Sequence, residues 1–218
     1  NQYVWVILFV TFSFGVIGLI DDYIKVVKQS YGGLSGRLRL IFGFIIAFIA
    51  VYFIQIQHLG DLSKSLALPI FKDHLVFMGA LFFPFAMIVI VGSANAVNLT
   101  DGLDGLASGL LAICFIVFAC IAYLSGRVDF SNYLNILYLP SSSELTIFSA
   151  AMAGSCIGYL WYNTSPAEIF MGDTGSLSTG AALGTIAVLL KKELLLAIVG
   201  GVFVWEAITV IIQISYFK

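Results

Sequence analysis

The sequence predicts an all-α protein, a polytopic bundle of helices that cross a membrane. Of its 218 residues, 61% are hydrophobic and only 10% are charged, and the mean hydropathy is +1.05. Soluble domains are about one-quarter charged, so this composition excludes a soluble fold. The apolar residues form continuous runs rather than alternating ones, which argues against a β-barrel. The net charge of −2 excludes the basic surface that binding a nucleic acid polymer requires.

Seven apolar runs, most of about 18 residues or 27 Å, are predicted to cross the hydrocarbon core as helices. They form one membrane domain that covers residues 1–218. The sixth run is the weakest, because it is short and rich in glycine and alanine. In chain order the runs cover residues 3–20, 40–56, 75–92, 105–124, 145–162, 177–190 and 194–214.

The loops between these runs must alternate between the two sides of the membrane. Loops that are separated by an even number of spans face the same compartment. The first set comprises residues 21–39, 93–104 and 163–176. The opposite set comprises residues 57–74, 125–144 and 191–193. Basic residues are divided equally between the sides, but their density in loop 21–39, close to a span, favours the first set as cytoplasmic.

Half of the twelve acidic residues lie in or beside the first set of loops, although a carboxylate at mid-membrane costs about 2.5–3.5 kcal/mol. These six are Asp21, Asp22, Asp101, Asp104, Glu168 and Asp173. Asp21 and Asp22 are adjacent, and their charges repel unless a cation lies between them. Mg²⁺ with substrate phosphates would relieve this repulsion, and Lys25, one turn later, can pair with Asp21 or with a phosphate. The alternative for this pair alone is two solvated residues at a membrane boundary.

A second polar segment covers residues 95–107, where polar residues recur at every third position. These are Asn95, Asn98, Asp101 and Asp104. Residues three positions apart are turned by about 60° from one another around a helix. The four polar side chains can therefore share one face only if the helix breaks. Gly102 and Gly105 permit such a break, which would present amides and carboxylates together. The alternative is a polar loop whose Asn and Asp residues cap helices.

A third segment, residues 168–177, places Asp173 between two glycines, Gly172 and Gly175. Glycines allow backbone amides to approach phosphates, and a helix that begins near Ser176 would favour an anion. Asp173 is therefore a candidate metal ligand. Phe170 can stack on a base, or it can simply pack in the membrane.

Together these segments resemble the polyprenyl-phosphate N-acetylhexosamine-1-phosphate transferase superfamily. The resemblance rests on GLIDDYIK at residues 18–25, NLTDGLDGLA at 98–107 and FMGDTGSL at 170–177. The wording of the last two segments is similar to the branch that uses UDP-N-acetylmuramoyl-pentapeptide. The resemblance continues in order through nearly the whole chain, including residues 200–204 and Gln213.

This resemblance implies a reaction of peptidoglycan biosynthesis. Phospho-N-acetylmuramoyl-pentapeptide would pass from its UDP conjugate to undecaprenyl phosphate, giving lipid I and UMP with Mg²⁺ as cofactor. The enzyme would be a multi-pass protein of the bacterial inner membrane, with a cytoplasmic site and a suggested homodimer. The family has about ten spans and a late His-rich loop, so the chain is expected to be truncated at both ends. His58 and His74 fall on the opposite side and are expected to be loop residues; whether this piece alone is active stays open.

The resemblance also implies roles for single residues. Asp21 and Asp22 would lie by the lipid phosphate, and Asp21 is the better candidate to deprotonate it or to attack. Asp173 would bind Mg²⁺ at the pyrophosphate. Phe170 would lie near the uracil, and Gln213 would reach the same cavity. The full set expected to line the nucleotide pocket is Lys25, Asn98, Asp101, Leu103, Asp104, Asn163, Phe170, Gly172 and Gln213.

Three alternatives to this function were considered. One is a related transferase that uses another UDP-N-acetylhexosamine. A second is a cation or proton transporter, which should place acids near mid-membrane on broken helices. Only Glu206 lies well inside a predicted span. It is expected to be a buried, hydrogen-bonded structural acid or a residue that lines the site. A third is a membrane scaffold, which would not explain three Asp clusters on one side.

Overall fold

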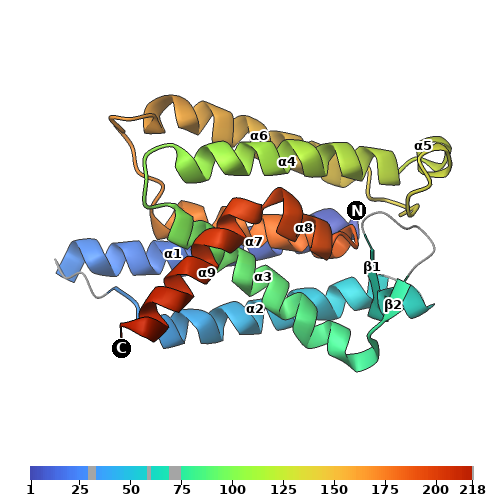
Figure 1. Cartoon of the computed structure of the whole chain (residues 1–218), viewed down its shortest axis with the longest axis horizontal. Helices are drawn as coiled ribbons and strands as arrows, with labels where there is room; N and C mark the ends of the chain where they lie inside the picture. Colours follow the sequence, from blue (N-terminus) through green and yellow to red (C-terminus); the bar gives the residue numbers. More distant parts are fainter. Residues whose placement is uncertain (29–32, 58–59, 69–74, 218) are drawn as a thin grey trace.

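The computed structural model describes residues 1–28, 33–57, 60–68 and 75–217, and this part of the chain is almost entirely helical (Figure 1). The helices are α1 (Gln2–Lys28), α2 (Gly36–Gln57), α3 (Phe82–Thr100), α4 (Leu106–Ser125), α5 (Val128–Tyr133), α6 (Glu144–Asn163), α7 (Gly172–Leu189), α8 (Glu193–Val199) and α9 (Gly201–Tyr216). Two strands, β1 (Ser65–Ala67) and β2 (Leu75–Phe77), pair antiparallel, with Leu66 opposite Val76. The 3₁₀ turns η1 (Gly60–Lys64) and η2 (Gly79–Leu81) flank this hairpin.

The predicted class, an all-α polytopic membrane protein, is confirmed. Among the described residues, five helices are long and apolar enough to cross a membrane: α1, α2, α3, α4 and α6. Helices α8 and α9 would make a sixth span if they count together, but they are bent by 83° at their junction. By length and composition, therefore, fewer helices qualify as membrane spans than the seven that were predicted. The third run also begins later than expected, because its first residues, from Leu75, form β2.

Helix α7 explains most of the difference. It forms over the sixth run but begins at Gly172, and its polar first turn makes it less apolar than a lipid-facing helix. Every residue from Gly180 to Leu189 is buried, and α7 lies in the centre of the bundle between α1 and α3 (Figure 1). Because protein rather than lipid covers this helix, it can carry glycine, serine and threonine at little cost.

Glycines allow α7 to lie very close to its two neighbours. A Cβ at Gly180 would lie 2.7 Å from the carbonyl oxygen of Ser93 in α3, and a Cβ at Gly18 of α1 would lie 2.2 Å from that of Asp173. No side chain separates the backbones at these two crossings, as is common where membrane helices pack tightly. This packing fixes the end of α1 against the start of α7.

The far end of α7 carries three consecutive charged residues that are buried rather than solvated. Lys191, Lys192 and Glu193 are 0%, 7% and 4% exposed. The ammonium of Lys191 lies 3.6 Å from the ring centre of Phe82 and donates hydrogen bonds to the carbonyl oxygens of Ser63 and Ser65. Lys191 thereby joins the end of α7 to the start of α3 and to the hairpin. The carboxylate of Glu193 accepts no hydrogen bond in the described part of the chain.

Candidate active site

Three segments that are far apart in the sequence meet at one end of the bundle. They are the end of α1, the end of α3 with the turn that follows it, and the first turn of α7, at the left of Figure 1. Asp21, Asp22 and Asp173 each offer a carboxylate oxygen, and these three oxygens lie within 4.8 Å of one another. The structure thus brings together residues that loop parity places on one side of the membrane.

Asp173 lies at the centre of the cluster, in the first turn of α7. Its Oδ2 accepts hydrogen bonds from Lys25 Nζ at 2.9 Å and from Arg39 Nη1 at 3.1 Å, and its Oδ1 accepts one from Asn98 Nδ2 at 2.7 Å. Burial alone would raise the pKa of Asp173, but hydrogen bonds with Asp21, Lys25 and Asn98 and the charge of Lys25 outweigh it. The pKa is therefore held below its ordinary value, and Asp173 is an anion at neutral pH.

Asp21 is almost completely buried at the end of α1, and one of its carboxylate oxygens lies within 4.8 Å of one on Asp173. Its Oδ1 accepts a hydrogen bond from the backbone N–H of Leu34, and its Oδ2 forms an ion pair with Lys25. Lys25 thus contacts Asp21, one turn earlier on α1, and Asp173 on α7 at the same time. This is the i,i+4 pairing that the sequence predicted.

Asp22 points in a different direction from its neighbour, because consecutive residues on a helix are turned by about 100°. Its Oδ2 accepts hydrogen bonds from the backbone N–H of Thr174 at 2.9 Å and from the Thr174 hydroxyl at 2.7 Å. Its Oδ1 accepts one from the backbone N–H of Asp173 at 3.2 Å. Gly172 adjoins this contact with φ +63°, and a Cβ there would lie 2.8 Å from Asp22 Oδ2.

The row of polar residues from 95 to 104 is divided by a helix break, as its spacing predicted. Helix α3 ends at Thr100, and Gly105 precedes α4 with φ +75°. Asn98, in the last turns of α3, reaches the cluster. Asn95 does not, because its side-chain amide donates to a carbonyl of its own helix at 2.8 Å.

Asp101 and Asp104 lie in the turn between α3 and α4. Burial and the nearby charge of Asp173 raise the pKa of Asp101 to about 6. Asp104 Oδ2 accepts a hydrogen bond from the backbone N–H of Ala167 at 3.2 Å, so it ties this turn to the segment before α7. Asp101 therefore belongs to the electrostatic cluster, whereas Asp104 borders it.

Asn163 is buried at the end of α6, and its side-chain amide is already engaged. Its Oδ1 accepts from the backbone N–H of Gly105 at 3.0 Å and from the Ser108 hydroxyl at 3.2 Å, and its Nδ2 donates to the carbonyl of Ile169 at 2.9 Å. These bonds hold the α6–α7 segment against the start of α4. A direct contact of Asn163 with substrate stays a prediction.

The remaining predicted residues are more accessible. Leu103 is 70% exposed and Phe170 is 74% exposed, so both can contact a ligand. Gln213 is exposed on α9, where its side chain forms no hydrogen bond with a described residue. Glu206 is half-buried and likewise lacks such a bond within the described ranges, so the hydrogen-bonded role expected for it is not seen. His58 and His74 lie outside the described residues.

Arg39 is a site residue that the sequence analysis used only as a count of charge. It lies in the first turn of α2, its side chain is 25% exposed, and its Nη1 reaches Asp173. Its Nε is buried and has no hydrogen-bond partner in the described structure. The signals that could have indicated it are its membership of the same loop set and its position at a helix start. Arg37, two residues earlier, is exposed to solvent instead.

The donor set fits a hard divalent cation. Mg²⁺ binds oxygen at 2.0–2.1 Å in an octahedron, so oxygens on opposite sides of the ion lie about 4.1 Å apart. The carboxylate oxygens of Asp21, Asp22 and Asp173, which all lie within 4.8 Å of one another, are close to this separation. The cluster therefore suits an ion that is held directly by two carboxylates, with other oxygens completing its shell.

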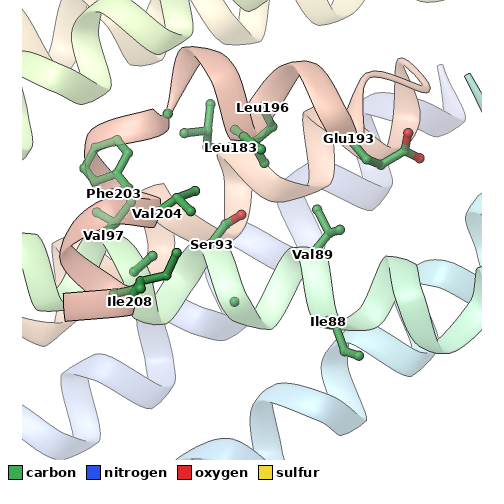
Figure 2. Close-up of a pocket in the computed structure, with 15 residues that line it drawn as sticks. Ile88, Val89, Ser93, Val97, Leu183, Glu193, Leu196, Phe203, Val204 and Ile208 are labelled. Carbon is green, nitrogen blue, oxygen red and sulfur yellow. The ribbon is translucent and has the colours of Figure 1, made fainter. Parts of the chain in front are cut away.

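An apolar pocket of about 250 Å³ lies between α3, α7, α8 and α9 (Figure 2). Val97, Phe203, Val204 and Ile208 gather at one end, and Glu193 lies at the other. Val97, which lines the pocket, immediately precedes Asn98, so the pocket and the carboxylate cluster approach the same turn of α3. No sequence pattern predicts this pocket, since it depends on the bend between α8 and α9.

Comparison with known proteins gives one family. The model of the family described as "Glycosyl transferase family 4" matches residues 4–191. Phospho-N-acetylmuramoyl-pentapeptide-transferases from Ruegeria sp. (strain TM1040), Dinoroseobacter shibae and Thermodesulfovibrio yellowstonii are 55%, 56% and 49% identical over the whole chain. The chain spans 60–61% of the length of these relatives. The resemblance seen in the three polar segments is confirmed, and the chain belongs to glycosyl transferase family 4.

Proposed function

We propose that the protein transfers phospho-N-acetylmuramoyl-pentapeptide from its UDP conjugate to undecaprenyl phosphate, giving lipid I and UMP with the help of Mg²⁺. The names of the relatives support the reaction. The observation that carries the chemistry is the convergence of Asp21, Asp22 and Asp173 with two cations at one end of the bundle. The reaction serves peptidoglycan synthesis at the cytoplasmic face of the bacterial inner membrane.

The transfer is a displacement at the phosphorus that carries the sugar. An oxygen of the acceptor phosphate donates an electron pair to this phosphorus, and the bond from phosphorus to the bridging oxygen breaks, so that its electrons leave with UMP. A phosphate monoester has a second pKa near 6, so the acceptor needs only a weak base at neutral pH. Asp21 serves as that base or orients the acceptor. A covalent route in which Asp21 attacks first would use the same residues.

The charged residues around Asp173 have different roles in binding a diphosphate. Mg²⁺, when bound by Asp173 and a second carboxylate, neutralises charge on the phosphate oxygens. Lys25 and Arg39 are close enough to turn from Asp173 to these oxygens, and the free Nε–H of Arg39 gives its guanidinium a second donor for a phosphate. Cations aimed at developing negative charge stabilise the transition state.

The nucleotide lies over the turns that border the cluster. Phe170 stacks on the uracil, which its exposure permits, and Leu103 contacts the same part of the donor. The other proposed members of this pocket are Lys25, Asn98, Asp101, Asp104, Asn163, Gly172 and Gln213. Asn163 contributes by holding the backbone of this region through its three hydrogen bonds. A homodimer is the proposed assembly.

The isoprenoid chain of the acceptor enters the apolar pocket between α3 and α9. Its lining is almost entirely hydrocarbon, and it begins beside Asn98, so a phosphate at the cluster and a chain in the pocket can belong to one molecule. Burial of apolar surface would then hold the acceptor in place without using the charged groups.

The test is UMP release by the full-length protein in detergent. UDP-N-acetylmuramoyl-pentapeptide should yield UMP only when a polyprenyl phosphate and Mg²⁺ are both present. Asp173→Asn should reduce turnover by at least about a hundredfold, whereas Asp129→Asn, the same change at an exposed position on α5, should leave it unchanged. Wild-type turnover in Asp173→Asn would refute the metal assignment. Equal use of UDP-N-acetylglucosamine would refute the choice of donor.

A further inference from the structure

The two adjacent carboxylates on α1 have different surroundings, although the sequence analysis treated both as catalytic. Asp21 contacts an ammonium and a loop N–H, whereas every hydrogen bond of the Asp22 side chain goes to the first turn of α7. These hydrogen bonds come from the backbone of Asp173 and from both donors of Thr174. Asp22 therefore contacts the residue that is the candidate metal ligand and the residue that follows it.

Helix α7 lacks a cap of its own. The first N–H groups of a helix have no intrahelical partner, and a side-chain oxygen of the preceding residue usually accepts from them. Met171 occupies that position in α7 and forms no such hydrogen bond. Asp22 supplies the missing acceptor from another helix, and its negative charge also matches the positive end of the helix dipole.

The contact has almost no freedom to move. Gly18, one turn before Asp22 on α1, brings the two backbones so close that a Cβ would lie 2.2 Å from the carbonyl oxygen of Asp173. Gly172 leaves similarly little space on the other side of the Asp22 carboxylate. The position of Asp22 thus sets where α7 begins, and with it the direction of the Asp173 side chain.

The hydrogen bonds also limit what Asp22 can do chemically. A carboxylate oxygen has about two acceptor sites, and Oδ2 uses both for Thr174. Oδ1 accepts only one longer hydrogen bond, so it retains a lone pair for a metal ion but lies against the helix start. Taking up a proton on Oδ1 would remove the negative charge that faces the start of α7.

We propose that Asp22 is a positioning residue, a helix cap that α1 supplies to α7, and that it acts on the reaction through Asp173. This inference rests on the proposed function for its kinetic consequences, but the coupling between Asp22 and Thr174 can be measured without any reaction.

The experiment is a double-mutant cycle in the full-length protein with Asp22→Asn, Thr174→Val and both together. Mn²⁺ binding is measured by electron paramagnetic resonance without substrate. Each single variant should weaken Mn²⁺ binding by about tenfold, the value of one hydrogen bond to a charged group. The double variant should lose little more, because both changes remove the same contact.

Two controls accompany the cycle. Thr179→Val removes a hydroxyl that donates only to carbonyls of its own helix, and it should leave Mn²⁺ binding unchanged. Thr174→Ser retains the hydroxyl donor and should restore binding, which separates loss of the cap from misfolding.

Additive losses in the double variant, or a Thr174→Val protein with normal Mn²⁺ affinity, would overturn the proposal. A wild-type protein that binds Mn²⁺ but releases no UMP would instead refute the proposed reaction, and the binding cycle would still decide the role of Asp22.

Discussion

Gly18→Ala is expected to separate α1 from α7 and to disable the site. The new Cβ would lie 2.2 Å from the carbonyl oxygen of Asp173 and 2.5 Å from Thr174 Cα. Non-bonded carbon and oxygen atoms stay more than about 3.2 Å apart, so the helices would have to move by about 1 Å. The atoms in the way belong to the backbone, which cannot rotate aside as a side chain can.

The expected cost follows from two opposing effects. Overpacking of this kind costs about 1–3 kcal/mol, and a backbone obstacle favours the upper end. Alanine is a better helix former than glycine and stabilises the helix by about 1 kcal/mol. The free energy of unfolding should therefore fall by about 2 kcal/mol in total. The kinetic effect should be larger, because a displacement of about 1 Å between reacting groups can reduce the rate by about a hundredfold.

Gly15→Ala provides the matched comparison on the same helix. Its Cβ would meet only Ser178 Cβ at 3.6 Å, an ordinary contact, so the variant should be as stable as the wild type or more so. Thermal unfolding in detergent and UMP release would be measured for both variants. Equal behaviour of Gly18→Ala and Gly15→Ala in both assays would refute the claim that backbone contact between α1 and α7 sets the site.

Two further predictions concern charged groups. The pKa of Asp101, about 6 in the folded protein, is above its unfolded value of 3.8, so its contribution to stability is full below about pH 4 and is lost as the pH rises through 6. Asp101→Asn should therefore become more stable than the wild type as the pH rises from about 4 to 6, as measured by thermal unfolding at each pH. A difference in stability between the two proteins that does not change with pH would contradict this prediction. Lys191→Met removes two hydrogen bonds and the contact with Phe82, and it should lower the free energy of unfolding by about 1–3 kcal/mol. Lys64→Met, at an exposed position in the same region, should have no effect, and equal effects would refute the anchoring role of Lys191.

The membrane class and the location of the acidic clusters on one side of the membrane could be predicted from the sequence. The first depends on local composition, and the second depends on the order of the spans. The Lys25–Asp21 pair was equally predictable, since it follows from helix spacing. The helix break after Thr100 was signalled by the glycines that follow it.

Other features depend on distances between helices, which no local pattern encodes. Hydropathy locates the apolar runs but not what surrounds them, so it could not show that α7 is covered by protein rather than by lipid. The division of roles between Asp21 and Asp22 arises from how closely α1 approaches α7. Arg39 reaches Asp173 only because α2 turns back beside α1.

Helix α7 is pinned at both of its ends. Asp22 binds its first turn, and Lys191, just beyond its last turn, is tied to the start of α3 and to the hairpin. A rod of about 27 Å that is held in this way cannot slide along its axis like a piston. Since α7 carries Asp173 in its first turn, these two contacts fix the height of that carboxylate relative to α1 and α3.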